Sequence, residues 1–347
     1  RSPSRGLGDV YKRQNQISFL DKIYELNNFH YKNSKKFKKI LDALFPKNKK
    51  KNLENLPFIP AKLFKEIELK SIIDKNIFKI LLSSGTSGTK TSKIFLDKDN
   101  AKKQTLVLNE IVSKIIGKKR LPMLIVDEKK NIFNPKKFDA KTAAILGFSL
   151  FGRDHTYLLE NGKINYENLN NFLRKYSETN FLIFGFTSFV YEHLIKEVNI
   201  ERISKDFLNG ILIHGGGWKK MEKIKISNLN FKEKLYSKLK LKKIFNYYGL
   251  IEQTGSIFFE CNKCSCFTPS DYSDVLIRDK NFKLINDNSK GFIQVISLLP
   301  TSYPGHSILT EDIGEIVKNN CDACFGKKQF IVHGRAEKSE IRGCSDV

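Results

Sequence analysis

Short, continuously apolar runs alternate with segments of helical spacing through the middle of the chain. The runs "LPMLIVD", "FLIFGF" and "GILIHGGG" are three examples, and apolar residues recur every three to four positions over residues 166–176 and 189–198. Continuous apolar runs are typical of strands buried on both faces, and helices between such strands connect parallel neighbours. The pattern predicts an α/β core with a largely buried sheet over residues 76–255.

The chain before this core has a different pattern. Residues 15–75 are basic, with helical spacing and a proline-marked turn at "LPFIPAKLF", which predicts a helical first subdomain. The opening "RSPSRGLGDVYKRQ" lacks the isoleucine and asparagine that are frequent afterwards. We therefore expect residues 1–14 to be a foreign segment left by assembly of the sequence.

Two apolar runs, "FKILLSSGTSGT" and "SKIFLD", surround a turn rich in Gly, Ser and Thr, and helical spacing follows over residues 98–116. Asp97 or Asp99 is suited to cap that helix. After about residue 255 the apolar runs become shorter, as in "DVLIRD", "GFIQVISLLP" and "GEIVKN". This change predicts a strand-rich subdomain over residues 256–335, followed by a hinge and a mobile tail over residues 336–347.

The chain carries 61 Lys and Arg against 37 Asp and Glu, a net charge of +24. The lysines are scattered and do not form a stripe interleaved with aromatic residues, so a solvated basic surface is favoured over a nucleic-acid groove. We expect no specific nucleic-acid partner. No apolar stretch reaches the length of a membrane span, and no secretory signal precedes the first subdomain, so we expect no transmembrane segment and a cytoplasmic location.

The six cysteines form two clusters and a singleton: Cys261, Cys264 and Cys266; Cys321 and Cys324; and Cys344 alone. Clustered cysteines in a chain without a secretory signal favour metal over disulfides, and four thiolates on tight turns suit a structural zinc ion. The spacing favours Cys261, Cys321 and Cys324 together with either Cys264 or Cys266. Unligated thiols are the alternative.

The stretch "SSGTSGTKTS" is the strongest single indication of chemistry. Two glycines allow backbone N–H groups to turn inward, while hydroxyls and a lysine add donors suited to a polyphosphate. It does not match the Walker pattern and leads into a strand instead of a helix. A hairpin turn rich in Ser, Thr and Gly is the plainer alternative. The candidate phosphate-binding residues are Ser83, Ser84, Gly85, Thr86, Ser87, Gly88, Thr89 and Lys90.

Three later segments carry further candidates. In "FNYYGLIEQTGS", Glu252 follows a predicted strand, where a carboxylate can hold a metal ion near a phosphate. In "SILTEDIGEI", the carboxylates of Glu311 and Asp312 are suited to accept hydrogen bonds from ribose hydroxyls. Two adjacent acidic residues before a glycine are, however, found more often in solvated turns. Arg335 and Cys344 follow in "HGRAEKSEIRGCSDV".

In their order along the chain, these segments resemble the signatures of the adenylate-forming enzymes. The longer strings "FGRDHTYLL", "GILIHGGGWKKM", "NYYGLIEQTGSIFFEC", "SLLPTSYPGHSILTEDIGEI" and "IRGCSDV" are similar to the acyl-protein synthetase family of the LuxE type, also called long-chain fatty acid–luciferin-component ligases. The similarity runs from about residue 58 to residue 347. It implies an α/β fold with a large N-terminal domain of layered sheets, a strand-rich subdomain and little or no C-terminal lid domain.

The resemblance also implies a reaction. A fatty acid would react with ATP to form acyl-AMP, and a cysteine of the enzyme, matched by Cys344, would capture the acyl group as a thioester. An acyl reductase of the LuxC type would then receive it. The thiol stands beside Arg342, which favours a thiolate, and Gly343, which permits movement.

The matching positions imply further roles. Glu252 would help to hold Mg²⁺ beside the phosphates bound by residues 83–90, and Asp312 would accept the ribose hydroxyls. Arg335 would contact ribose or phosphate. Tyr248 belongs to the Tyr-Gly-x-x-Glu signature that ends at Glu252. The segment that lies against adenine in the family is matched by Gly215, Gly216 and Gly217.

Two departures from the wider superfamily stand out. Glu311 occupies a position where glycine is usual, and the lysine that assists adenylation from a C-terminal domain has no counterpart in this chain. Lys90 or another basic residue would substitute for it. The alternative function is that of a phenylacetate-CoA ligase-like enzyme that passes the acyl group to coenzyme A. A basic scaffold protein that has kept the fold without the chemistry is the rival from another class.

Overall fold

The computed structural model describes residues 5–45, 50–83, 90–129, 140–218, 226–324 and 326–336. The α-helices of these ranges are α1 (Arg5–Asn33), α2 (Lys35–Leu44), α3 (Leu63–Glu66), α4 (Lys98–Ile116), α5 (Ala140–Ser149), α6 (Tyr166–Tyr176), α7 (Thr187–Phe189) and α8 (Asn228–Leu239). A π-helix covers Val190–Glu197, and a 3₁₀ turn that matters for the site covers Ile251–Gln253.

The first strands are β1 (Ile59–Pro60), β2 (Lys79–Leu82), β3 (Lys93–Leu96), β4 (Leu121–Glu128), β5 (Gly152–Glu160), β6 (Lys163–Ile164), β7 (Phe181–Phe186) and β8 (Gly210–Gly215). They are followed by β9 (Lys243–Tyr248), β10 (Phe258–Glu260), β11 (Phe267–Thr268), β12 (Ser273–Arg278), β13 (Gly291–Ser297), β14 (Ser307–Val317) and β15 (Gln329–Arg335). The α/β class predicted from the sequence is confirmed.

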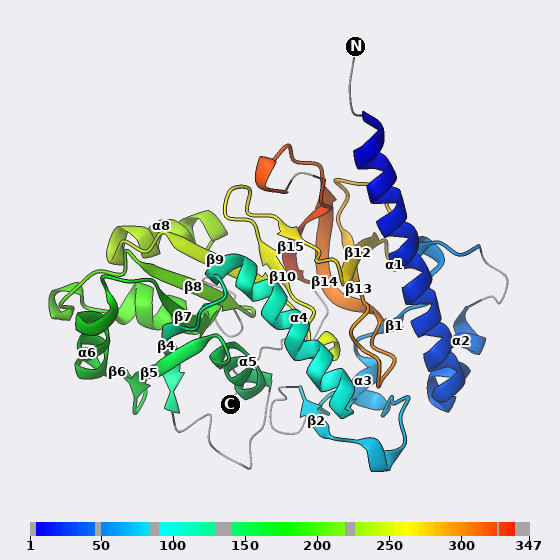
Figure 1. The fold of residues 1–347 in the computed structure, drawn as a ribbon, viewed down its shortest axis with the longest axis horizontal. Helices are drawn as coiled ribbons and strands as arrows, with labels where there is room; N and C mark the ends of the chain where they lie inside the picture. Colours follow the sequence, from blue (N-terminus) through cyan, green and yellow to red (C-terminus); the bar gives the residue numbers. More distant parts are fainter. Residues whose placement is uncertain are drawn as a thin grey trace.

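Within the described ranges, thirteen strands form one sheet in the order β12-β13-β14-β15-β11-β10-β9-β8-β7-β4-β5-β6, with β1 paired to β14. Strands β5, β4, β7, β8 and β9 run parallel, whereas β10 to β15 pair antiparallel. Figure 1 shows the parallel half beside α6 and α8, and the antiparallel half beside α1 and α2. Strands β2 and β3 form a separate hairpin.

The parallel strands are buried because helices cover both of their faces. Every residue of β7 and β8 is buried, as continuous apolar runs predict. One face packs against α6, α8 and the π-helix through residues such as Leu173 and Phe231. The other face packs against α4 and α5 through residues such as Ile111 and Phe148. The carboxyl ends of these strands therefore meet at one edge of a rigid core.

The predicted helices over residues 98–116 and 166–176 are confirmed by α4 and α6. Asp97 caps α4, because its side chain accepts a hydrogen bond of 2.8 Å from the Asn100 N–H. The helix expected over residues 189–198 has a different form, since the chain continues from α7 into the π-helix. Such widened turns are frequently found near functional sites.

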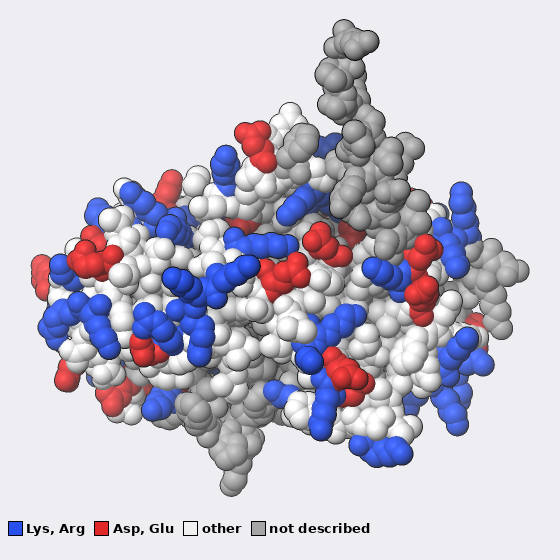
Figure 2. All heavy atoms as spheres, in the orientation of Figure 1, with Lys and Arg blue, Asp and Glu red and all other residues white. Residues whose placement is uncertain are grey.

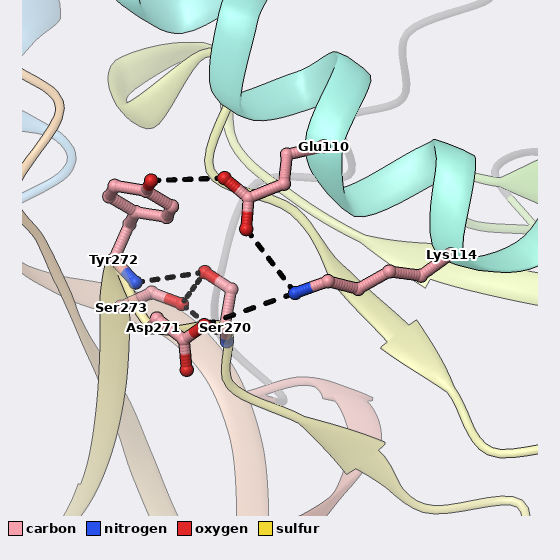
Figure 3. Close-up of polar contacts among 6 residues, drawn as sticks. All are labelled: Glu110, Lys114, Ser270, Asp271, Tyr272 and Ser273. Atoms are coloured by element: carbon pink, nitrogen blue, oxygen red, sulfur yellow. Dashed lines mark hydrogen bonds and ion pairs between the residues drawn. The ribbon is translucent and has the colours of Figure 1, made fainter. Parts of the chain in front are cut away.

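Helix α4 also joins the two halves of the sheet. Figure 3 shows Tyr272, which precedes β12, donating its hydroxyl to the Glu110 carboxylate at 3.0 Å. Lys114, one turn further along α4, pairs with Glu110 and lies 3.9 Å from Asp271. These contacts are exposed, so they orient the helix more than they stabilise it.

Lys and Arg are spread over the face shown in Figure 2, with Asp and Glu among them. Some lysines of the described residues pair with nearby carboxylates, as Lys114 does with Glu110 and Lys205 with Glu178. The cations on this face do not gather into one stripe. Among the helices of the described ranges, none combines the length and apolar character needed to cross a bilayer.

Helix α1 is docked onto the antiparallel half by a pair of buried histidines. The rings of His30 and His306 stack with centroids 5.0 Å apart. His30 lies within hydrogen-bond distance of Ser71 and of the Pro300 carbonyl, and His306 lies 3.1 Å from Asn27 of the same helix. Burial lowers the pKa of His30 from 6.5 to about 4 and that of His306 well below its ordinary value.

We predict that acid weakens this docking between about pH 6.5 and pH 4. Above that range both rings are neutral whether the chain is folded or unfolded, so their contribution is intact. Below pH 6.5 the unfolded chain takes up protons that the folded chain refuses, at a cost of about 1.4 kcal/mol per pH unit for each histidine. Urea unfolding of the wild type and of His306→Gln across this range should show a shallower pH dependence in the variant.

The matched control is His155→Gln, because His155 is exposed. Its pH dependence should follow the wild type. Equal slopes for His306→Gln and the wild type would show that the buried histidine does not carry the acid sensitivity.

Candidate functional site

The candidate residues gather at the carboxyl ends of the central parallel strands. Phe186 of β7 is in register with Gly215 of β8, and Gly215 with Tyr247 of β9. Tyr247 is in turn paired with Phe259 of β10. In open α/β sheets, ligands bind outside the carboxyl ends of the strands. This row therefore marks the floor of the candidate site.

The glycine segment at the end of β8 allows a close approach of the backbone. A Cβ on Gly215 would lie only 2.7 Å from Cδ1 and Cζ of the Tyr247 ring, a contact that real side chains do not make. Gly216 has φ of +77°, in the region that glycine adopts most readily. Gly216 and Gly217 are exposed, whereas Trp218 is buried against Tyr191 and Phe231. The exposed backbone of Gly216 and Gly217 therefore directly follows a strand end that is packed against the Tyr247 ring.

Three of the candidates meet beyond the end of β9. The Tyr248 hydroxyl donates to Asp312 Oδ2 at 2.6 Å, and Arg335 Nε lies 3.8 Å from Asp312 Oδ1. Arg335 also lies 4.0 Å from Glu311. Pairing of β14 with β15 sets this geometry, since Asp312 and Arg335 are directly opposite each other. The predicted ribose-binding carboxylate is thus held between a phenol and a guanidinium.

Burial dominates the electrostatics of this group. It raises the pKa of Tyr248 well above its ordinary value, and the charge of Asp312 adds to the effect. Burial also raises the pKa of Asp312, although the Tyr248 hydrogen bond and the Arg335 charge act in the opposite direction. A carboxylate in such surroundings binds hydroxyl donors strongly, because few water molecules compete with them.

Glu252 lies in the 3₁₀ turn after β9 and is buried. Its Oε1 accepts a hydrogen bond of 2.8 Å from the Ser92 hydroxyl, and its carbonyl accepts one of 2.9 Å from Tyr303. The Ser92 contact ties the β2–β3 hairpin to the sheet. Sequence reasoning did not single out Ser92 as a partner of Glu252, and its only signal was its place as the last residue of the hydroxyl-rich stretch.

Ser83 and Ser92 close the base of the candidate phosphate loop. The Ser83 N–H donates to the Ser92 carbonyl at 3.0 Å, and the Ser92 N–H donates to Ser83 Oγ at 2.7 Å. Between Ser83 and Lys90, the other six candidate residues of the loop lie outside the described residues: Ser84, Gly85, Thr86, Ser87, Gly88 and Thr89. Cys344 also lies outside them. The structure thus positions the two ends of the loop beside Glu252.

Unlike Ser92, which is buried beside Glu252, Lys90 lies at the surface. Its ammonium pairs with Glu66 Oε2 at 2.7 Å, and 70% of the side chain is exposed. An exposed ion pair of this kind contributes little to stability and holds its cation loosely. The described part of the structure thus joins Lys90 to α3 at the surface.

The cysteine clusters converge. The sulfur atoms of Cys261, Cys264, Cys321 and Cys324 all lie within 4.8 Å of one another. Cys261 Sγ lies 3.8 Å from Cys321 Sγ, and Cys264 Sγ lies 3.7 Å from Cys324 Sγ. Of the two alternatives for the fourth ligand, Cys264 belongs to this group and Cys266 lies outside it.

Cys266 is excluded by the way its turn is closed. Its backbone carbonyl accepts a hydrogen bond from the Cys261 N–H, its side chain is buried, and its thiol donates to the Cys264 carbonyl at 3.5 Å. Burial raises the pKa of Cys266 and that of Cys264, the latter to about 12.

Comparison with known proteins gives three kinds of similarity. The sequence model of the family described as "Acyl-protein synthetase, LuxE" matches residues 4–347. The long-chain-fatty-acid–luciferin-component ligase of Aliivibrio fischeri is 25% identical over 312 residues, which covers 88% of this chain and 81% of that protein.

Solved structures share the fold. The open conformation of a 2-hydroxyisobutyryl-CoA ligase, in complex with 2-HIB-AMP and CoA, has a TM-score of 0.71 at 12% identity, covering 93% of this chain and 70% of that one. The luciferase-like enzyme of the mealworm Zophobas morio has a TM-score of 0.50 at 18% identity, covering 78% and 60% of the two chains. These similarities confirm the predicted adenylate-forming fold.

We predict that Gly215→Ala displaces the Tyr247 ring and lowers stability by about 1–3 kcal/mol, because the added methyl overpacks a buried contact. Urea unfolding and the near-ultraviolet circular dichroism of tyrosine should both report the change. Gly147→Ala in α5 is the matched control, since its methyl would meet only Leu108 Cδ2 at 3.8 Å. Similar stabilities for the two variants would contradict the close approach at Gly215.

Proposed function

Because the chain belongs to the LuxE family of acyl-protein synthetases, and thereby to the ATP-dependent ligases, we propose that it activates a long-chain fatty acid as an acyl adenylate and then acylates its own Cys344. A partner acyl reductase would receive the acyl group from the thioester. The Aliivibrio fischeri relative, which is named as a long-chain-fatty-acid ligase, supports the choice of substrate.

One observation carries the proposal. The base of the hydroxyl-rich loop is joined to Glu252 through Ser92, while Tyr248, four residues before Glu252, is joined to Asp312. The base of the candidate phosphate loop and the candidate ribose-binding carboxylate thus flank the end of β9. A nucleoside triphosphate presents phosphates to the first of these and ribose hydroxyls to the second.

In the first step, a carboxylate oxygen of the fatty acid attacks the α-phosphorus of ATP. A bond forms between that oxygen and phosphorus, and the bond from phosphorus to the pyrophosphate oxygen breaks. Asp312 accepts the ribose hydroxyls, and Arg335 offers a fixed cation nearby. The exposed glycines after β8 let adenine lie against the backbone, beside the Tyr247 ring.

Magnesium fits the donors at the loop base. The Glu252 carboxylate and the Ser92 hydroxyl supply oxygen atoms, which are the ligands that Mg²⁺ prefers, and both side chains are buried. Glu252 would hold the ion, which would offset the negative charge of the phosphates. The residues of the chain then keep the polyphosphate in line for departure of pyrophosphate.

In the second step, the Cys344 thiolate attacks the acyl carbon. A carbon–sulfur bond forms, the carbon–oxygen bond to AMP breaks, and AMP leaves with the electron pair. Covalent capture keeps the acyl group on the protein until the reductase accepts it. Coenzyme A as the acceptor is the alternative that the experiment distinguishes.

We predict that radiolabelled tetradecanoate, incubated with the protein, ATP and Mg²⁺, stays on the wild type after denaturation and is released by hydroxylamine, which cleaves thioesters. Cys344→Ser should retain no label, although its ATP–pyrophosphate exchange should remain. Cys266→Ser is the matched control and should label like the wild type. Exchange without label on the wild type would contradict self-acylation and favour coenzyme A.

We further propose that Cys261, Cys264, Cys321 and Cys324 bind a structural zinc ion. Tetrahedral zinc with Zn–S bonds of about 2.3 Å keeps its sulfurs about 3.8 Å apart. The Cys261–Cys321 and Cys264–Cys324 sulfur separations of 3.8 and 3.7 Å match this spacing. Burial opposes ionisation of Cys261, but hydrogen bonds from the backbone of Cys264 and Lys263 outweigh it and lower the pKa to about 7. The donor set therefore fits the ion.

We predict that the purified protein holds one zinc ion per chain and that Cys264→Ser loses it, with a lower melting temperature. Elemental analysis and thermal unfolding check both points. Cys266→Ser should keep the metal, because its sulfur lies outside the four-cysteine cluster. Equal metal content in the two variants would contradict the assignment.

A further inference from the structure

A buried ion pair lies at the carboxyl end of β4, apart from the candidate nucleotide and zinc residues. Lys141, in the first turn of α5, places its Nζ 2.8 Å from Asp127 Oδ2. The two side chains are only 7% and 2% exposed. The same ammonium lies 4.3 Å from the centre of the Phe189 ring.

Such a pair is costly to keep. Removing both charges from water requires several kcal/mol per ion, and an apolar pair of similar size is often equally stable or better. Among the ion pairs of the described residues, Lys232–Glu260 is also largely buried. That pair has an evident structural role, because Lys232 also bonds Ser265 in the turn that carries the cysteines. The Lys141–Asp127 pair instead lies between the end of β4 and the start of α5.

The register of the sheet locates the pair relative to the nucleotide residues. Ile125 of β4 is level with Phe184 of β7, and Asp127 and Phe186 follow two residues further along these parallel strands, toward the same edge of the sheet. Phe186 is in turn level with Gly215. With neighbouring strands about 4.8 Å apart, β4 lies about 10 Å from β8, the strand that ends in Gly215.

The pair also lies on the face that α5 covers. Side chains alternate along a strand, and Ile125 belongs to the core beneath α4 and α5, whereas Val126 belongs to the core on the opposite face. Asp127 faces α5, because its carboxylate pairs with Lys141 of that helix. Tyr247 belongs to the core beneath α4 and α5, so the ion pair and the ring beside Gly215 are on one face.

An ammonium has three donors, and within the described residues its polar contact is Asp127. Donors therefore remain for a ligand. The first turn of α5 adds backbone N–H groups and the positive end of the helix dipole, which favour an anion. Nearby aromatic rings, with Phe148 stacked on Phe184 at 4.4 Å, supply apolar surroundings. An anion with an apolar body matches this combination.

We propose that Lys141 binds the carboxylate of the acyl substrate and that Asp127 acts as a positioning residue for its ammonium. This inference rests on the proposed function, and it names the residue that orients the attacking group. Asp127 offsets the charge of Lys141 before the substrate arrives, so that the cation can stay buried. Lys90, the basic residue first expected to assist adenylation, is exposed and paired with Glu66.

The test measures binding without catalysis. Calorimetry with tetradecanoate and with tetradecan-1-ol, in the absence of ATP, should show that the wild type prefers the carboxylate. Lys141→Gln should bind tetradecanoate about 10- to 100-fold more weakly, because a hydrogen bond to a charged group is lost, and should bind the alcohol as before. Lys141→Arg should recover part of the preference.

Two controls distinguish a loss of carboxylate binding from a loss of folding and from the removal of any lysine. The double variant Asp127→Asn/Lys141→Gln leaves no unpaired buried charge, so it separates loss of binding from loss of folding. Lys205→Gln removes a cation from the exposed ion pair with Glu178 and should bind as the wild type does. An undiminished preference for tetradecanoate in Lys141→Gln or in the double variant would overturn the proposal.

Pyrophosphate exchange on the same proteins distinguishes this inference from the proposed function. A raised KM for tetradecanoate with an unchanged KM for ATP supports both. A wild type that shows the carboxylate preference but no exchange would overturn the proposed function alone, since the binding measurement does not depend on it.

Discussion

The register of four parallel strands, β4, β7, β8 and β9, is the constraint on which the candidate site depends. Once Phe181 pairs with Gly210 and Ile211 with Lys243, the end of each strand has a fixed neighbour. A slip by one residue would turn every side chain to the opposite face. Because both faces are buried in closely packed cores, that slip would place each side chain against the wrong neighbours and leave clashes and voids on both faces. The fold thus holds the floor of the site without help from a ligand.

The parts of the site that lie outside this register are attached by a few polar contacts. Ser92 and Glu252 are 160 residues apart in the chain, yet their buried hydrogen bond brings the hairpin against the turn after β9. Tyr248 and Asp312 make a similar bond across 64 residues. Each bond is worth only about 0.5–3 kcal/mol, but each joins elements that are already rigid. Small energies therefore suffice to set the geometry.

Features set by local spacing could be predicted from the sequence, whereas contacts between distant segments could not. Helices α4 and α6 and the buried strands follow from local spacing, and Asp97 was recognisable as a cap from its position before α4. The choice between Cys264 and Cys266 was not recognisable, because it depends on which carbonyl closes the turn. The pairing of Lys141 with Asp127 depends on packing of α5 against β4, and a lone Asp at the end of an apolar run gives no indication of its partner.

The four-cysteine cluster joins two turns that flank strands of the candidate site, so its effect is not confined to local stability. Cys261 and Cys264 follow β10, which pairs with β9 and so with the strand that ends in Tyr248. The other two cysteines precede β15, which carries Arg335 opposite Asp312. A metal ion that joins the two turns would therefore fix β9 relative to β15, the strands that supply the phenol and the guanidinium on either side of Asp312. Tyr248 and Arg335 come from segments that are distant in the chain. A metal bridge between the two cysteine turns would therefore constrain the distance between them more than a contact within either segment.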